Sequence, residues 1–194
     1  MPTEKERSLS TQKAIIKLIP VFRKYGYEGT TLSMLSQASG LSKASLYHHF
    51  PKGKEEMAGA VFDYVGSCFR DKVLKPLWEQ GEPLERIQAM CRSLQEFYEN
   101  GRNTCFLAIM SFGEADNLFH DSVKQRLQIW IDTLARVLIE AGIEPNKAKA
   151  RSIEAIVQIQ GALILVRILD DFTIFKKAIE DLPRKLFNND RNES

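Results

Sequence analysis

The sequence is poor in the patterns that mark secreted, membrane-spanning and zinc-binding proteins. Its three cysteines, Cys68, Cys91 and Cys105, are scattered and form no CxxC pair, which argues against a disulfide framework or a zinc site. No run of about 18 apolar residues is present that would span a membrane. The polar, charged N-terminal stretch is unlike a secretory signal. We therefore expect a protein of the reducing cytoplasm that makes no contact with a membrane.

The sequence also lacks the arrangements that enzymes use. It contains no HExxH, no glycine-rich phosphate loop and no recognisable pairing of a nucleophile with a base. We therefore assign no catalytic residue, no metal ligand and no cofactor, and we expect a protein that is not an enzyme.

Helical periodicity runs through the whole chain, whereas strand-like alternation of apolar and polar residues is absent. The prediction is an all-α fold of about nine helices, with an N-terminal three-helix head at residues 1–57 and a helical body at residues 58–194. The expected helices cover about residues 11–25, a short segment after Thr31, 43–49, 54–75, a segment opening at Pro83, and then 105–112, 118–141, 147–169 and 173–186.

The segment Thr30–Glu56 predicts two short helices joined by a tight turn. Thr31 is a suitable N-cap for the first helix and Ser42 for the second, and Gly40 supplies the left-handed residue that ends the first. The second helix, Lys43–His49, carries hydroxyls, a lysine, a tyrosine and imidazoles but no acid, which suits a polyanion. This is the layout of a DNA-binding helix-turn-helix, whose second helix enters the major groove.

At these residues the segment resembles the N-terminal domain of the TetR/AcrR family of transcriptional repressors. The matching positions lie within about residues 11–58: Phe22, Gly26, Thr31, Gly40-Leu41-Ser42, Leu46-Tyr47, Phe50 and Lys54-Glu55. Pro20 is a departure from the family pattern and is expected to kink the first helix near Ile16. The resemblance implies a homodimer that binds operator DNA and responds to a small molecule.

Lys43 is the best candidate for reading a base, because its ammonium can donate to guanine O6 and N7. The resemblance places Ala44 and Ser45 beside it at base edges, and Tyr47, His48 and His49 at phosphates. Ser42, Thr31, Ser33 and Lys54 complete the predicted DNA-binding set. Four of these residues have a structural alternative. Thr31 would act only as a cap, Tyr47 would pack under Pro51, His49 would be a buried histidine, and Lys54 would be a solvated turn residue.

Charge is distributed unevenly along the chain. Residues 1–57 contain nine Lys or Arg and five Glu, a net charge of +4, whereas the whole chain carries +2. This modest excess agrees with DNA binding by the head, although ordinary surface variation would also produce it.

The last two helices offer an apolar surface for a second subunit, and the family pairs such helices as a four-helix bundle. The predicted dimer interface consists of Ile156, Ile159, Leu163, Ile164, Arg167, Phe175, Ala178, Ile179 and Leu182. The alternative is a core within one chain, which must account for some of these positions.

The middle of the chain is expected to hold an apolar or aromatic effector, because its helices are rich in aromatic residues and poor in charge. The predicted lining is Phe69, Phe97, Tyr98, Cys105, Phe106, Ile109, Met110, Phe112, Phe119, Trp130 and Gln158. Aromatic residues at helical spacing are also the ordinary content of a core. Cys105 begins a short helix, where a thiol pKa can be lowered, so it is either a reactive thiol or a small buried residue.

These features predict a ligand-responsive transcriptional regulator, a repressor that binds a palindromic operator as a homodimer and is released by its effector. Two alternatives stay open. One is a regulator that senses electrophiles through Cys105, and the other is a helical dimer that binds protein partners without binding DNA.

Overall fold

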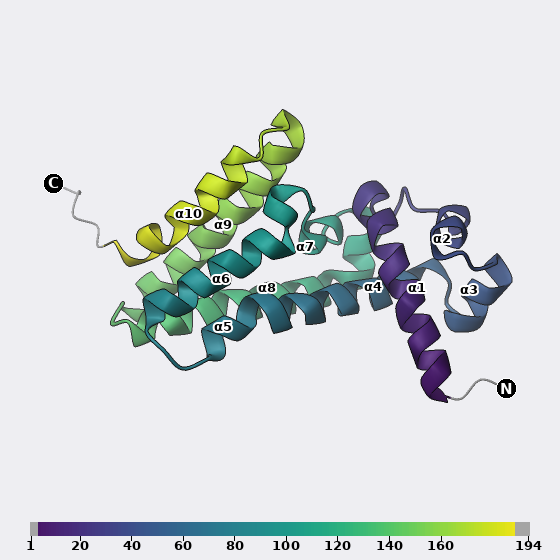
Figure 1. Cartoon of the computed structure of the whole chain (residues 1–194), viewed down its shortest axis with the longest axis horizontal. Coiled ribbons are helices and arrows are strands. Elements are labelled where there is room, and N and C mark those ends of the chain that lie inside the picture. The colour runs from purple at the N-terminus through teal and green to yellow at the C-terminus, as the bar shows by residue number, and fades with distance from the viewer. Residues whose placement is uncertain (1–3, 189–194) are drawn as a thin grey trace. The chain divides into compact units, whose positions relative to one another are not determined.

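The structure is a computed structural model that describes residues 4–188, with side chains from residue 10 onward. Within this range every regular element is a helix, as predicted, and no strand is present. Counting α4, η1 and α5 as one continuous helical run, and leaving out the short 3-10 turn η2, gives nine helices in the described part of the chain. The chain forms two compact units, and Figure 1 shows the helices of both.

The first unit combines the residues up to Ser67 with Phe106–Val123. It holds α1 (Glu4–Tyr25), α2 (Leu32–Ser39), α3 (Lys43–His49), most of α4 (Lys54–Phe69), α7 (Phe106–Ile109) and the start of α8 (Gly113–Glu140). Leu18 and Phe22 of α1, Leu35 of α2, and Leu46 and Phe50 of the α3 segment are all buried. These buried side chains form the core on which α2 and α3 pack. Figure 1 shows α2 and α3 beside α1.

The second unit combines Cys68–Cys105 with the described residues from Lys124 onward. It contains η1 (Arg70–Leu74), α5 (Lys75–Trp78), α6 (Pro83–Phe97), η2 (Glu99–Gly101), the rest of α8, α9 (Pro145–Leu169) and α10 (Thr173–Phe187). Helix α10 packs along both α9 and α6. The side chains buried in this unit include Leu77, Ile87, Leu94, Trp130 and Phe175.

The helix predicted over residues 54–75 has a different course in the structure. Its α-helical part ends at Phe69, a π-helical turn follows at Arg70–Leu74, and Pro76 lies in the first turn of α5 instead of ending the run. Pro76 follows the π-helical turn directly, and prolines and π-bulges are both common where the regular hydrogen-bond ladder of a helix is interrupted. Helix α1 likewise continues through Pro20.

Helix α9 is long and apolar enough to cross a membrane, judged by length and composition alone. The same composition occurs in core helices of soluble proteins. One side of α9 is buried within its own unit, including Ala155, Ile159 and Val166. Its apolar character is therefore partly explained by packing inside the chain.

Candidate nucleic-acid interface

Helix α3 is held on the core by one edge and exposes the other. Leu46 and the following Phe50 are buried, whereas Lys43, Ala44, Tyr47 and His48 are exposed. Acidic residues are absent from α3. The exposed edge therefore offers an ammonium, a phenol and an imidazole to an anionic partner, with no carboxylate to repel it.

Both predicted caps are confirmed. Thr31 Oγ1 accepts a hydrogen bond from the Met34 N–H at 3.3 Å, and Ser42 Oγ accepts one from the Ser45 N–H at 3.1 Å. The Ser42 and Ser45 hydroxyls are also hydrogen-bonded to each other at 2.9 Å. Ser45 is half-buried, and its hydroxyl is hydrogen-bonded at the start of α3. Ser33 on α2 is exposed.

Side-chain bonds hold the turn between α2 and α3. Gly40 has φ +74°, the left-handed conformation that glycine adopts without steric cost. Ser36 Oγ donates to the Leu41 carbonyl at 2.6 Å, and Lys17 Nζ of α1 donates to the Ser39 carbonyl at 3.0 Å. These bonds fix the orientation of α3 relative to α1 and α2.

Two of the side chains predicted to contact phosphate bond back into the first unit. His49 is half-buried, and its Nδ1 is 3.1 Å from Thr11 Oγ1. Lys54 Nζ donates to the Tyr27 carbonyl at 3.1 Å and lies 4.1 Å from the centroid of the Tyr27 ring. Burial, followed by the charges of nearby carboxylates, raises the pKa of Tyr27, so its ring stays neutral beneath the ammonium.

Tyr47 is 46% exposed. Its ring borders the turn at Gly53, where Tyr47 Cε1 is 3.1 Å from the position that a Gly53 Cβ would take. The phenol is therefore accessible while one edge of its ring packs on this turn.

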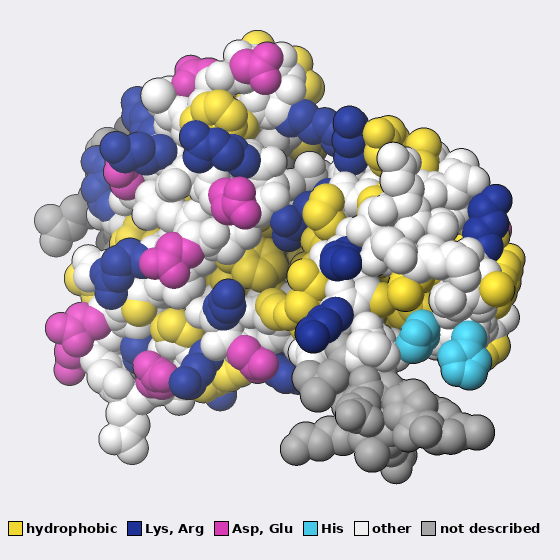
Figure 2. Space-filling view, turned by 45° about the vertical axis from the view of Figure 1, so that its right-hand side comes forward, with side chains coloured by type: hydrophobic (Ala, Val, Ile, Leu, Met, Phe, Trp, Pro, Cys, Tyr) yellow, Lys and Arg dark blue, Asp and Glu magenta, His cyan; other side chains and the backbone are white. Residues whose placement is uncertain are grey.

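The surface charge agrees with the position of this edge. Figure 2 shows the histidine side chains on the right-hand part of the face with no acidic side chain beside them. A surface with few carboxylates lowers the electrostatic cost of approaching phosphate.

The structure distributes the predicted effector residues between the two units. In the second unit, the rings of Phe69, Phe97, Tyr98 and Trp130 form one aromatic cluster. Cys105 adjoins it and is buried, and its Sγ accepts from the Tyr98 hydroxyl at 3.4 Å. Gln158 instead bonds α10 through the Ala178 carbonyl. The remaining five belong to the first unit: Phe106, Ile109, Met110, Phe112 and Phe119.

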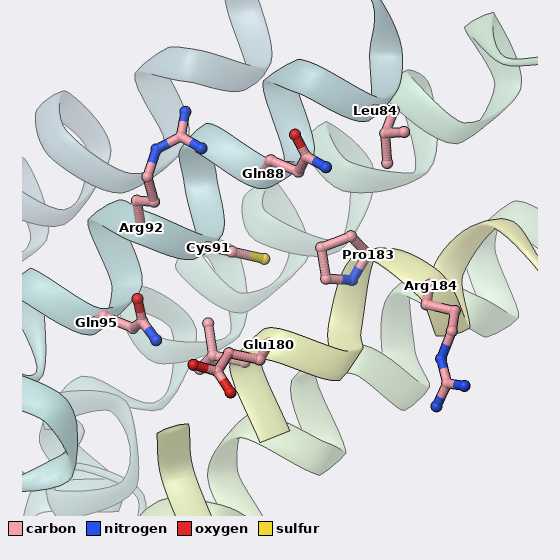
Figure 3. A pocket seen from close by; sticks show the side chains of 9 residues that line it. Leu84, Gln88, Cys91, Arg92, Gln95, Glu180, Pro183 and Arg184 are labelled. Carbon is pink, nitrogen blue, oxygen red and sulfur yellow. The ribbon is translucent and has the colours of Figure 1, made fainter. Parts of the chain in front are cut away.

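A groove of about 450 Å³ lies between α6 and α10 (Figure 3). It contains none of the predicted effector residues. Burial raises the pKa of Cys91, which lines it, to about 12, so this thiol stays protonated. The groove is lined by Leu84, Gln88, Cys91, Arg92, Gln95, Ile179, Glu180, Pro183 and Arg184.

Most residues predicted at the dimer interface are buried within their own chain. Helices α9 and α10 pack on each other, and six of the predicted residues on them are buried: Ile156, Ile159, Leu163, Phe175, Ile179 and Leu182. Ala178 is half-buried, and only Ile164 and Arg167 are exposed. A different apolar face of α9 is uncovered, and it comprises Ile153, Val157, Ile164, Leu165 and Ile168. Sequence periodicity did not separate these two faces, because α9 is apolar nearly all round.

Comparison with known proteins gives consistent results along the chain. The family profile described as bacterial regulatory proteins, tetR family, matches residues 19–61. The profile of the LmrA/YxaF-like transcriptional regulator C-terminal domain matches residues 83–181. The chain is 25% identical over 181 residues to the uncharacterized HTH-type transcriptional regulator YxaF of Bacillus subtilis strain 168, covering 91% of this chain and 95% of that protein.

Solved structures share the fold. A TetR transcriptional regulator from Chloroflexus aurantiacus J-10-FL superposes with a TM-score of 0.79 at 21% identity, covering 95% of this chain and 98% of that one. AibR in complex with isovaleryl coenzyme A and operator DNA superposes with a TM-score of 0.68 at 20% identity, covering 92% of this chain and 98% of that one.

Proposed function

This chain belongs to the tetR family of bacterial regulatory proteins and is a transcriptional regulator with a helix-turn-helix, not an enzyme. From this premise we propose that it is a cytoplasmic repressor that binds a palindromic operator as a homodimer and is released by a small apolar or aromatic effector. The observation that carries the proposal is the capped, acid-free α3 with Lys43, Ala44, Tyr47 and His48 on its exposed edge.

The uncovered apolar face of α9 supports the homodimer. Val157 is 66% exposed and Ile168 is 69% exposed, and Ile153, Ile164 and Leu165 extend the same surface. A contiguous exposed apolar surface favours association. A second copy would also supply the second α3 that a palindromic operator requires.

Two observations support a small-molecule effector. The aromatic cluster around Trp130 is apolar and lies in one unit. In addition, AibR, which shares the fold, holds both an acyl coenzyme A and operator DNA. To drive the regulator from mostly bound to mostly free, an effector must prefer the non-binding state by about 10⁴-fold.

A mobility shift on the DNA upstream of the gene tests DNA binding. Wild-type protein is expected to retard a specific fragment, and Lys43→Ala is expected to bind about 1–3 kcal/mol more weakly and to tolerate change at one base pair. Lys124→Ala, a change at an exposed lysine of α8, is the control and is expected to bind as wild type does. If Lys43→Ala binds every operator variant as tightly as wild type does, the assignment of Lys43 to a base is refuted.

The electrophile-sensing alternative depends on access to Cys105. This thiol is 4% exposed, and its sulfur accepts from Tyr98 and from Gln160 Nε2, the latter at 3.3 Å. These contacts favour a buried structural residue. Mass spectrometry after mild alkylation of the folded protein is expected to show no label at Cys105, and rapid labelling would revive this alternative.

A further inference from the structure

The aromatic cluster of the second unit brings together rings from α4, α6, α8 and α10, with Tyr98 at the C-terminal end of α6. Phe69 stands 4.8 Å from Trp130 and 5.2 Å from Phe97, measured between ring centroids. Phe97 lies 5.2 Å from Tyr98, which in turn lies 5.9 Å from Phe175. These pairs have the edge-on geometry that aromatic rings prefer.

One polar atom in this cluster has no partner. Tyr98 donates its hydroxyl hydrogen to Cys105 Sγ. Trp130 is fully buried, yet its indole N–H has no hydrogen-bond partner anywhere in residues 4–188. A buried indole N–H ordinarily finds an acceptor, because leaving it unpaired forfeits its hydration without compensation. An unpaired donor inside an apolar cluster therefore needs a functional explanation.

The helix beside Trp130 has an unusual geometry at the point of contact. Phe69 is the last α-helical residue before the π-helical turn Arg70–Leu74, in which the Lys75 N–H donates to the Arg70 carbonyl. Such turns are rare and frequently mark functional sites. Phe69 and Phe97 are only half-buried, unlike Trp130, so they are the rings that would move to admit a ligand.

We propose that the Trp130 indole N–H is the hydrogen-bond donor that selects the effector, and that the effector is a neutral aromatic compound carrying a carbonyl oxygen. This inference rests on the proposed function, because it assigns the effector of that regulator. The surrounding rings stack on the aromatic part, and the carbonyl oxygen accepts from Nε1. A buried donor also discriminates against an analogue that lacks the acceptor, because that analogue leaves the N–H unpaired.

Matched pairs of ketone and hydrocarbon test this directly. The probes are indanone with indane, tetralone with tetralin, and fluorenone with fluorene, which span three sizes. Wild-type protein is expected to bind at least one ketone about tenfold more tightly than its hydrocarbon. Trp130→Phe is expected to lose that preference, and Trp78→Phe, a change at an exposed tryptophan, is expected to keep it.

A spectroscopic measurement covers the case in which Trp130→Phe does not fold. The chain has two tryptophans, so Trp78→Phe leaves one indole N–H resonance in the NMR spectrum. That resonance is expected to move downfield with the ketone and not with the hydrocarbon. Equal shifts with both members of each pair, or no binding of any ketone up to its solubility, would overturn the inference.

The mobility-shift assay distinguishes failure of the proposed function from failure of the role proposed for Trp130. Loss of operator binding by untreated wild-type protein would refute the proposed function and leave the indole–ketone bond standing. Operator binding that persists while every ketone fails would refute only the role of Trp130.

Discussion

Ser42 and Lys54 are both predicted to contact DNA, and each also makes a hydrogen bond within the chain. Ser42 Oγ accepts from the Ser45 N–H, and Lys54 Nζ donates to the Tyr27 carbonyl. A side chain that stabilises the head and contacts DNA lowers DNA affinity by two routes when it is removed. Stability and binding must therefore be measured separately for each.

Ser42→Ala is expected to lower the free energy of unfolding by about 1 kcal/mol, because it leaves an N–H in the first turn of α3 without its cap. Urea unfolding followed by circular dichroism measures the change. Ser33→Ala removes an exposed hydroxyl from α2 and is the control, with an expected change within about 0.5 kcal/mol. Equal stability of the two variants would contradict the capping role.

Lys54→Gln tests whether the ammonium reaches phosphate despite its bond to Tyr27. If it does, the logarithm of the binding constant should depend less steeply on the logarithm of salt concentration, with a slope smaller by about one unit. Base preference should stay as in wild type. An unchanged slope combined with lower stability would assign Lys54 to the fold alone, through its contacts with the Tyr27 carbonyl and ring.

At the scale of elements, local signals were sufficient to predict α2 and α3. The caps Thr31 and Ser42 and the left-handed Gly40 act within one or two turns of chain, so sequence alone located α2 and α3. The π-helical turn after Phe69 was missed, because its geometry depends on packing between distant segments. The groove between α6 and α10 was missed for the same reason, since its two walls are at least 84 residues apart in the sequence, from Gln95 to Ile179, and share no local pattern.

The start of α8 depends on a contact that sequence could not indicate. Glu28 Oε1 accepts from the Glu114 N–H at 2.6 Å, and Gly113 permits this approach because a Cβ there would collide with the carboxylate. Backbone hydrogen bonds, first its own and then those of Glu114 and Ala115, lower the pKa of Glu28. The ionised carboxylate therefore stabilises the folded state at neutral pH.

Glu28→Gln is expected to destabilise the protein by roughly 0.3–1 kcal/mol at pH 7, near the lower limit because the carboxylate is exposed. The folded-state pKa lies below the unfolded one. The stabilisation is therefore complete above the unfolded pKa and is lost as pH falls through the folded pKa. Urea unfolding between pH 7 and pH 3 should show the two proteins converging at acid pH. Asp121→Asn, at an exposed position of α8 beyond its first turn, is the control and should track wild type throughout.

At the scale of the molecule, α9 has two apolar faces, of which one is buried and the other is exposed. Ile159 and Val166 are buried within the second unit, whereas Val157, Ile164 and Ile168 are exposed. Periodicity alone did not divide these faces, because hydrophobicity is the same whether a side chain packs on its own chain or on a second copy. The residues that a second copy would cover are therefore those that remain exposed in the single chain.

Val157→Arg combined with Ile164→Arg is expected to convert the dimer to a monomer. Burying two unpaired guanidinium groups in an apolar interface should raise the dimer dissociation constant by about 100-fold or more. Sedimentation equilibrium measures the mass, and operator affinity should fall with it because one head contacts one half-site. Ile139→Arg, at an exposed position of α8, is the control and should stay dimeric. If the double variant keeps the wild-type mass and unfolds at the wild-type urea concentration, the exposed face of α9 is not the interface and the second subunit must bind elsewhere.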